Sequence, residues 1–326
     1  MVNFIKPTRW IPLLKRTNIL RDIMLMLKIS ARFPIFLLVE PTNDCNLECY
    51  FCPRKTSRRG VGYIDFKLYK KIIDESAKFG KRMMLGLQKD GEPLLHPSIS
   101  KLIKYAKDNS VAHVVHLATN ALALNEEMAI GILRSGLDDL LISIDAAKGE
   151  TYKKIKGRDN LRQVEENVNH FLQLKNKINS RKPFVRVKLI KTTDNIEEVE
   201  LFRKKWQGLV DGIEITDLFQ WGDAENIDIG FTNSLSRYPC LFPWYWPAIN
   251  WNGDVSICCY DFNSEGIIGN LYEDSLSNIW RNSKLRHIRS AHLDRKYERI
   301  PFCAKCKSWS MSPNIGSWLR RRALND

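Results

Sequence analysis

The sequence has no apolar run long enough to span a bilayer, no internal repeat and no tract of low complexity. It also has no RNP or KH sequence, so a nucleic-acid partner is not expected. No signal peptide precedes its eight cysteines, which predicts a reducing cytoplasm and metal binding in place of a disulfide scaffold. Acidic residues are too few to balance the basic ones, 37 against 51, and the net charge of +14 favours polyanionic or phosphorylated partners.

The chain is long enough to bury a core: its 326 residues are 44% hydrophobic and 27% charged. Residues 1–33 alternate apolar and basic residues in the pattern of an amphipathic helix. This segment has two alternative locations. It can contact an anionic membrane surface through residues 10–32, or it can cap the bottom of the next domain, which we prefer as the simpler arrangement.

Residues 34–224 alternate short apolar runs with amphipathic stretches, which predicts a parallel β/α domain. The predicted strands are 35–41, 83–88, 111–118, 138–145, 184–191 and 212–218. The predicted helices lie at 66–76, 99–106, 128–133, 161–171 and 196–206. Six such units indicate an open, partial (β/α)6 barrel, in which chemistry collects at the C-terminal ends of the strands. Residues 225–326 are richer in aromatic residues, Asn and Gly, and we expect a smaller α+β domain there with a hairpin at 251–258.

Three cysteines follow the first predicted strand directly, in the spacing C-x3-C-x2-C: Cys45, Cys49 and Cys52. Zinc or a closed iron–sulfur cluster requires four thiolates, whereas three leave one metal position open. The alternatives are a structural zinc loop or incidental cysteines.

Polar residues stand at the ends of the later strands as well. Gly91-Glu92-Pro93 follows the second strand, where such a turn exposes backbone carbonyls that can receive an ammonium group, and taken alone it is also an ordinary turn. On the fourth strand Ser143 and Asp145 share one face and need polar partners.

The fifth strand directs two cations, Arg186 and Lys188, away from its apolar face. Buried cations need anionic partners, such as a ligand carboxylate or an anionic substrate. The alternative is that both simply pair with Asp145 or Glu214.

The cysteine loop resembles that of radical S-adenosylmethionine (SAM) enzymes, in its spacing, in its place after a strand and in Phe51 before the last cysteine. The resemblance implies a [4Fe-4S] cluster on the three thiolates, with SAM chelating the fourth iron. Asp90-Gly91-Glu92-Pro93 is similar to the family's Gly-Gly-Glu-Pro segment, which binds the amino group of SAM, with Asp90 in place of the first glycine. Thr119-Asn120-Ala121 resembles the family's Thr-Asn-Gly, with Ala121 as a departure.

On this resemblance, the expected SAM-binding residues are Phe51, Asp90, Gly91, Glu92, Asn120, Ser143, Asp145, Arg186 and Lys188. Asp145 is also a candidate catalytic residue, because the partner of its carboxylate can be a substrate hydroxyl in place of the SAM ribose.

The other five cysteines lie in the C-terminal part. Cys240, Cys258, Cys303 and Cys306 supply four thiolates, enough to close a second [4Fe-4S] cluster, and zinc is the alternative. This part resembles the auxiliary-cluster domain of SPASM/twitch radical SAM enzymes, in the form with one auxiliary cluster. Its C-x17-C spacing and terminal C-x2-C are similar to those of aminocyclitol dehydrogenases that oxidise 2-deoxy-scyllo-inosamine.

The resemblance implies an enzyme in which an electron, supplied by a donor such as flavodoxin or ferredoxin, cleaves SAM to a 5′-deoxyadenosyl radical that abstracts hydrogen. A four-thiolate cluster has no open iron for substrate, so electron transfer is its expected role. We expect dehydrogenation of a carbinol in a small molecule: a sugar, an aminocyclitol or a nucleotide-linked sugar, with a phosphorylated one compatible with the charge.

Other readings remain open. Cys259 is a spare thiol beside a cluster ligand, and an epimerase would use it to return a hydrogen atom to the substrate. A peptide or protein maturase of the RiPP or sulfatase type is a second alternative. RNA modification is supported only by the charge, and a non-enzymatic iron–sulfur scaffold would leave Gly91-Glu92-Pro93 without a role.

Overall fold

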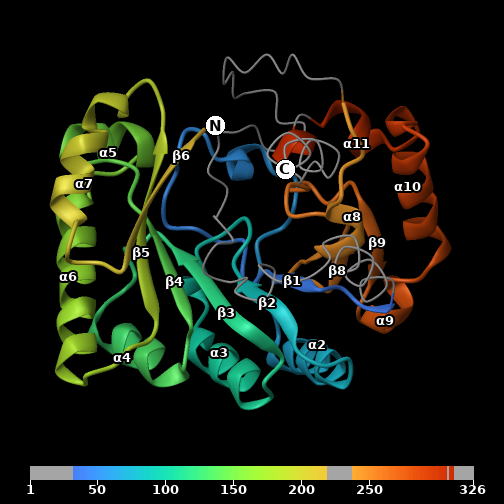
Figure 1. The fold of residues 1–326 in the computed structure, drawn as a ribbon, viewed down its shortest axis with the longest axis horizontal. Helices are drawn as coiled ribbons and strands as arrows, with labels where there is room; N and C mark the ends of the chain where they lie inside the picture. Colours follow the sequence, from blue (N-terminus) through green and yellow to red (C-terminus); the bar gives the residue numbers. More distant parts are fainter. Residues whose placement is uncertain (1–31, 219–236, 307, 312–326) are drawn as a thin grey trace, which may run out of the picture.

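The computed structural model describes residues 32–218, 237–306 and 308–311 (Figure 1). The basic segment predicted for residues 1–33, with its membrane-contacting part at 10–32, therefore lies almost entirely outside the described residues. None of the helices in the described ranges is both long enough and apolar enough to cross a membrane.

Six parallel strands form the barrel part of the sheet. They are β1 (Phe36–Val39), β2 (Arg82–Leu87), β3 (Ala112–Thr119), β4 (Asp139–Ser143), β5 (Phe184–Lys191) and β6 (Gly212–Asp217). Each pairs in parallel with the next along the chain, and each begins and ends within two residues of its predicted bounds. The predicted partial (β/α)6 architecture is confirmed.

Helices cover one face of these strands (Figure 1). The predicted ones are α2 (Phe66–Lys78), α3 (Ile99–Asp108), α4 (Glu126–Ser135), α6 (Leu161–Lys177) and α7 (Val199–Trp206), the last preceded by a 3-10 turn, η5 (Ile196–Glu198). On β5, Val185, Val187 and Leu189 are fully buried on the helix side. Arg186 and Lys188 therefore face the inside of the barrel, as the alternation predicts.

One helix was not expected from the sequence. It is α5 (Gly149–Lys156), which lies between β4 and α6 and buries Tyr152, Ile155 and Lys156 on one side. Its C-terminal end contacts the loop after β1, because Glu48 N donates to Lys156 O at 3.1 Å and Tyr50 N donates to Ile155 O at 3.0 Å.

The C-terminal part continues the same sheet instead of forming a separate one. Its strands are β7 (Ala248–Ile249), β8 (Asp254–Ser256) and β9 (Ile267–Asn270), and its helices are α8 (Phe242–Tyr245), α9 (Leu276–Ile279), α10 (Ser283–Leu293) and α11 (Pro301–Lys305). Strand β7 pairs in parallel with β1, so the sheet runs β6-β5-β4-β3-β2-β1-β7-β8-β9. The edge of the barrel at β1 is thereby covered.

The predicted hairpin is confirmed as the antiparallel pair β7–β8. Its turn closes through Gly253 N, which donates to Asn250 O at 3.0 Å, and Gly253 adopts a φ of 86°. Only glycine enters that left-handed region without strain, which explains the Asn-Gly signal in the sequence.

Candidate active site

The first candidate centre is the loop that carries Cys45, Cys49 and Cys52, all of them half-buried. The loop folds back on its own backbone, where Arg54 Nη2 donates to Cys45 O at 3.3 Å and to Leu47 O at 3.4 Å. Burial raises the pKa of Cys45 to about 11 and that of Cys52 to about 12. Both are therefore thiols at neutral pH in the metal-free chain, and metal binding must displace their protons.

The Gly91-Glu92-Pro93 segment lies directly against this loop. A Cβ atom added at Gly91 would stand 2.4 Å from Thr42 O and 2.5 Å from Asp44 O, so only glycine permits the approach. Glu92 N donates to Asp44 O at 2.7 Å. The two motifs that the sequence singled out separately are thus parts of one site.

Glu92 ties the ends of β2 and β3 together. Its buried carboxylate accepts from Thr119 Oγ1 at 2.6 Å, from Asn120 N at 2.7 Å and from Leu94 N at 3.0 Å. Asn120 in turn donates to Asn46 Oδ1 in the cysteine loop at 2.8 Å. Because the Glu92 carboxylate is occupied by the protein, the groups this segment can offer a ligand are its backbone carbonyls.

Asp90 takes part in a buried network of four charges with Glu40, Arg59 and Lys89. Arg59 Nη1 donates to Asp90 Oδ2 at 2.8 Å and to Glu40 Oε1 at 3.0 Å, and Lys89 Nζ also bonds Asp90 Oδ2. Burial raises the pKa of Asp90 to about 6, against the lowering effect of Lys89. The side chain of Asp90 is therefore held by protein cations.

Ser143 and Asp145 do lie together, as predicted, but with a partner that sequence reasoning missed. Asp145 Oδ2 accepts from Ser143 Oγ at 2.7 Å and from Lys156 Nζ at 2.5 Å, and Oδ1 accepts from Ile190 N at 2.7 Å. Asp145 lies beyond the end of β4, in a left-handed conformation with φ of 65°.

Lys156 is also electrostatically close to the cluster loop. Burial raises the pKa of Cys49, and the Lys156 ammonium is the main group that lowers it. The only sequence signal for this lysine was the i, i+3, i+4 spacing of Tyr152, Ile155 and Lys156 on α5.

The two cations of β5 have acidic partners of their own. Arg186 donates to Asp139 Oδ1 at 3.0 Å and to Glu214 Oε2 at 2.6 Å, so its pairing with Glu214 matches the alternative considered above, while Asp145 is paired with Lys156 instead. Lys188 Nζ lies 3.6 Å from Glu214 Oε1, beyond hydrogen-bond distance. Ligand binding by these residues stays a prediction, and Lys188 is the better placed of the two.

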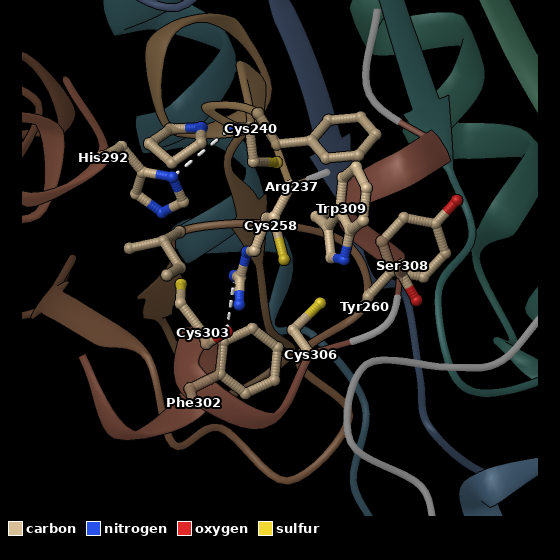
Figure 2. A pocket seen from close by; sticks show the side chains of 13 residues that line it. Arg237, Cys240, Cys258, Tyr260, His292, Phe302, Cys303, Cys306, Ser308 and Trp309 are labelled. Atoms are coloured by element: carbon tan, nitrogen blue, oxygen red, sulfur yellow. Dashed lines mark hydrogen bonds between the residues drawn. The ribbon is translucent and has the colours of Figure 1, made fainter. Parts of the chain in front are cut away.

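The second candidate centre lies between α8, β8 and α11. The four cysteines predicted to bind the second cluster, Cys240, Cys258, Cys303 and Cys306, line one cavity, and their thiols turn toward the shared space (Figure 2). The walls of this cavity are largely apolar, with Phe242, Ile257, Tyr260, Phe302 and Trp309.

Two basic side chains also border this cavity, His292 and Arg237. Cys240 N donates to His292 Nδ1 at 3.3 Å, and the Arg237 guanidinium stacks 4.1 Å from the centre of the Tyr297 ring. Burial and the nearby Arg237 charge lower the pKa of His292 to about 4. Neither residue was singled out from the sequence, where a lone His or Arg carries no signal.

Cys259 is not among the residues that line this cavity. Burial raises the pKa of its thiol to about 12, and the ammonium of Lys89 and the carboxylate of Asp90 act on it from the end of β2. The charges that act on Cys259 thus come both from the end of β2 and from Cys240 of the auxiliary cavity.

Both centres suit iron–sulfur clusters. Within the described ranges no group of three or more His, Cys, Asp or Glu side chains is arranged to hold a single metal ion. The thiolates of a four-iron cluster bind different irons, so they surround a space instead of converging on one point. Three thiols in the barrel and four around the auxiliary cavity match that requirement.

Comparison with known families agrees with both sites. A model of the radical SAM superfamily matches residues 39–199, and a model of the SPASM iron–sulfur cluster-binding domain matches residues 240–307. The chain belongs to the radical SAM superfamily. Its radical SAM domain binds SAM and a [4Fe-4S] cluster, and its SPASM domain binds an auxiliary iron–sulfur cluster.

The relatives of this radical SAM protein include a cofactor-modifying protein. The chain is 23% identical over 313 residues to the tungsten-containing aldehyde ferredoxin oxidoreductase cofactor-modifying protein of Pyrococcus furiosus, and the match covers 83% of this chain and 86% of that protein.

Among solved structures, BtrN in complex with AdoMet and 2-DOIA is 18% identical, with a TM-score of 0.56, and the match covers 84% of this chain and 93% of BtrN. SuiB of Streptococcus suis, bound to its precursor peptide SuiA, is 16% identical, with a TM-score of 0.67, and the match covers 83% of this chain and 70% of SuiB. These two likenesses show the fold.

Proposed function

We propose that this radical SAM protein dehydrogenates a carbinol carbon of a small polar molecule, a sugar, an aminocyclitol or a nucleotide-linked sugar, with the auxiliary cluster as electron acceptor. The observation that carries the proposal is the arrangement of the five C-terminal cysteines. Four of them line one cavity and Cys259 is not among them. A cluster with four protein thiolates has no free iron position for a substrate, which leaves electron transfer as its function.

When bound, SAM and the two clusters would supply a 5′-deoxyadenosyl radical and an electron acceptor. The substrate would lose a hydrogen atom from carbon to that radical, its hydroxyl proton to a base and one electron to the acceptor, and would become a ketone. These losses amount to two electrons and two protons, as the oxidation of an alcohol requires.

The chain's own residues shape the space between the two sites. Ser143, Lys188 and Glu214 are register neighbours across β4, β5 and β6, so a hydroxyl, an ammonium and a carboxylate form one polar row on the inner face. Such a row suits hydroxyl and amino groups of a substrate, and Lys188 suits a phosphate. The parallel pairing of β1 with β7 brings the aromatic-rich auxiliary part beside the barrel, where it helps to exclude water.

Among the relatives, BtrN supports a small substrate. The match covers 93% of BtrN, a 2-deoxy-scyllo-inosamine dehydrogenase, but 70% of SuiB, whose structure holds a bound precursor peptide. The matched part of this chain thus corresponds to nearly all of a small-molecule enzyme and to only part of the peptide-binding one. The Pyrococcus furiosus relative, which covers a similar share of this chain, modifies a cofactor.

The test is anaerobic turnover in deuterated water with SAM, a reductant and a panel of cyclitols, aminocyclitols and nucleotide sugars. The proposal expects one 5′-deoxyadenosine per ketone formed, with no solvent deuterium fixed at the reacting carbon. Cys259→Ala should leave this stoichiometry unchanged. A panel that yields no product, while a precursor peptide encoded beside the gene is modified, would replace this proposal with peptide maturation.

A second candidate, epimerisation, is favoured by one observation: Cys259 is the C-terminal cysteine that does not line the auxiliary cavity, and the charges of Lys89 and Asp90 act on its thiol. In that reaction the thiol would return a hydrogen atom to the substrate carbon, and the resulting sulfur radical would then need one electron and one proton from the reductant and solvent. Inverted product that carries one deuterium, no ketone, and loss of turnover in Cys259→Ala would establish it.

A further inference from the structure

The cavity between the four auxiliary cysteines is bordered by two residues, His292 and Arg237, that each carry a buried nitrogen atom without an acceptor among the described residues. His292 on α10 is 1% exposed, and its Nε2 makes no hydrogen bond there. Arg237 donates from Nη2 to Cys303 O at 2.6 Å, whereas its Nε is buried without a partner in the same part of the chain. A buried donor left unsatisfied costs about 1–3 kcal/mol, so an acceptor is expected for each.

The hydrogen bond at the other ring nitrogen fixes which atom of His292 carries the proton. Cys240 N donates to His292 Nδ1, so Nδ1 accepts through its lone pair and carries no hydrogen. In a neutral imidazole the proton is then on Nε2, which makes that atom a donor. Figure 2 shows the ring of His292 at the border of the cavity, with its Nδ1 bonded to the backbone at Cys240.

We propose that His292 Nε2 and Arg237 Nε donate hydrogen bonds to sulfur atoms of the auxiliary [4Fe-4S] cluster and so raise its reduction potential. Hydrogen bonds to cluster sulfurs stabilise the more negative, reduced form, and this is one of the protein's main controls over the potential. The inference deepens the proposed dehydrogenation and rests on it for its purpose, because a higher potential increases the driving force for accepting the substrate's electron. Both residues act as positioning and tuning groups, since neither is placed against the substrate.

The test measures the auxiliary cluster alone, in the full chain with Cys45, Cys49 and Cys52 changed to Ala, by redox titration followed by EPR. His292→Phe keeps a planar ring but removes the donor, and Arg237→Lys keeps the charge but removes Nε–H. Each should lower the ratio of reduced to oxidised cluster at a fixed potential by about tenfold, a shift of about 59 mV for one electron.

The matched control is His287, an exposed histidine on the same helix α10. His287→Phe should leave the midpoint reduction potential of the auxiliary cluster unchanged. His292→Gln should have a midpoint between those of His292→Phe and the parent, because an amide can both accept from Cys240 N and donate to sulfur. A midpoint in His292→Phe equal to that of His287→Phe, at equal iron and sulfide content, would overturn the proposal.

If His292→Phe fails to hold its cluster, the parent protein decides the question. Pulsed EPR of the reduced auxiliary cluster should show coupling to a ring nitrogen and to an exchangeable proton, and the lack of both would also overturn it. These measurements need neither SAM nor substrate. If the substitutions shift the reduction potential as expected but no substrate is oxidised, only the proposed dehydrogenation is contradicted. If the reduction potential does not shift, only the proposed hydrogen bonds are contradicted.

Discussion

The ion pair between Lys156 and Asp145 offers the sharpest test of how the barrel site is held together. The Lys156 side chain is 3% exposed and the Asp145 side chain 0%, with Nζ and Oδ2 2.5 Å apart. At that distance two unit charges attract by roughly 6–7 kcal/mol at an effective dielectric constant of about 20. Removing the lysine also removes the cost of burying its ammonium, so the net loss from Lys156→Met should be about 3–5 kcal/mol of unfolding free energy.

The assay is urea denaturation of the metal-free protein in reductant, followed by tryptophan fluorescence and far-UV circular dichroism. Lys154→Met is the matched control, because Lys154 lies on the same helix, is exposed, and pairs with Asp194 at the surface. Its midpoint should match the parent's. In the double variant Lys156→Met with Asp145→Asn, the loss should be smaller than the sum of the single losses by about 0.5–3 kcal/mol.

A second effect of the same change reaches the cluster loop. The Lys156 ammonium lowers the pKa of Cys49 against the effect of burial, so Lys156→Met should raise that pKa further. Less of the thiolate then forms at neutral pH, and reconstitution should incorporate less iron at the barrel site than in Lys154→Met. A Lys156→Met protein as stable as Lys154→Met, with equal iron, would refute the reasoning.

Three further predictions follow, one from the number of cysteines and two from the contacts of Gly91 and Asp139. The parent should reconstitute with about eight irons per chain, and the triple alanine variant of the barrel cysteines should keep about four irons and lose reductive SAM cleavage. Gly91→Ala should weaken SAM binding in calorimetry at least tenfold, because its Cβ would stand 2.4 Å from Thr42 O, and unchanged affinity would contradict the packing of the two motifs. Although burial opposes it, His116 and Arg186 hold the pKa of Asp139 at about 2, below the usual value of about 4. The resulting stability, about 2 kcal/mol, is present above pH 4 and lost as pH falls toward 2, so Asp139→Asn should flatten that part of the stability profile measured by urea denaturation.

The strands could be predicted because parallel strands buried under helices are continuous or alternating apolar runs, and residues such as Val185 and Val187 are fully buried here. Helix α5 was missed because one of its three buried positions is Lys156, which interrupts the apolar period. The pairing of β7 with β1 was also out of reach. Strand β7 has two residues and meets a partner about 210 positions away, for which a single sequence carries no signal.

The grouping of Cys240, Cys258, Cys303 and Cys306 around one cavity could be predicted because cluster chemistry fixes the number of thiolates and permits few groupings. The partners of charged side chains could not be predicted. The sequence shows that Arg186 needs an anion, but it does not show that Asp139 on the neighbouring strand supplies it. The acceptor-less nitrogens of His292 and Arg237 became visible only when the fold brought α10, Arg237 and the four cysteines to one cavity.

Asp90, the departure from the family's glycine, has a physical explanation in the way the two sites are joined. Its carboxylate holds Arg59 and Lys89, and both of these cations reach the region of the auxiliary hairpin. Lys89 Nζ donates to Asp261 O at 3.0 Å, while Arg59 binds Glu40, whose Oε2 accepts from Trp251 N at 3.2 Å. A glycine at position 90 would leave two buried cations with one carboxylate between them, which is costly. Since Asp261 and Trp251 flank the strand that leads to Cys258, Asp90 helps to fix the position of the Gly91-Glu92-Pro93 segment relative to the auxiliary cavity.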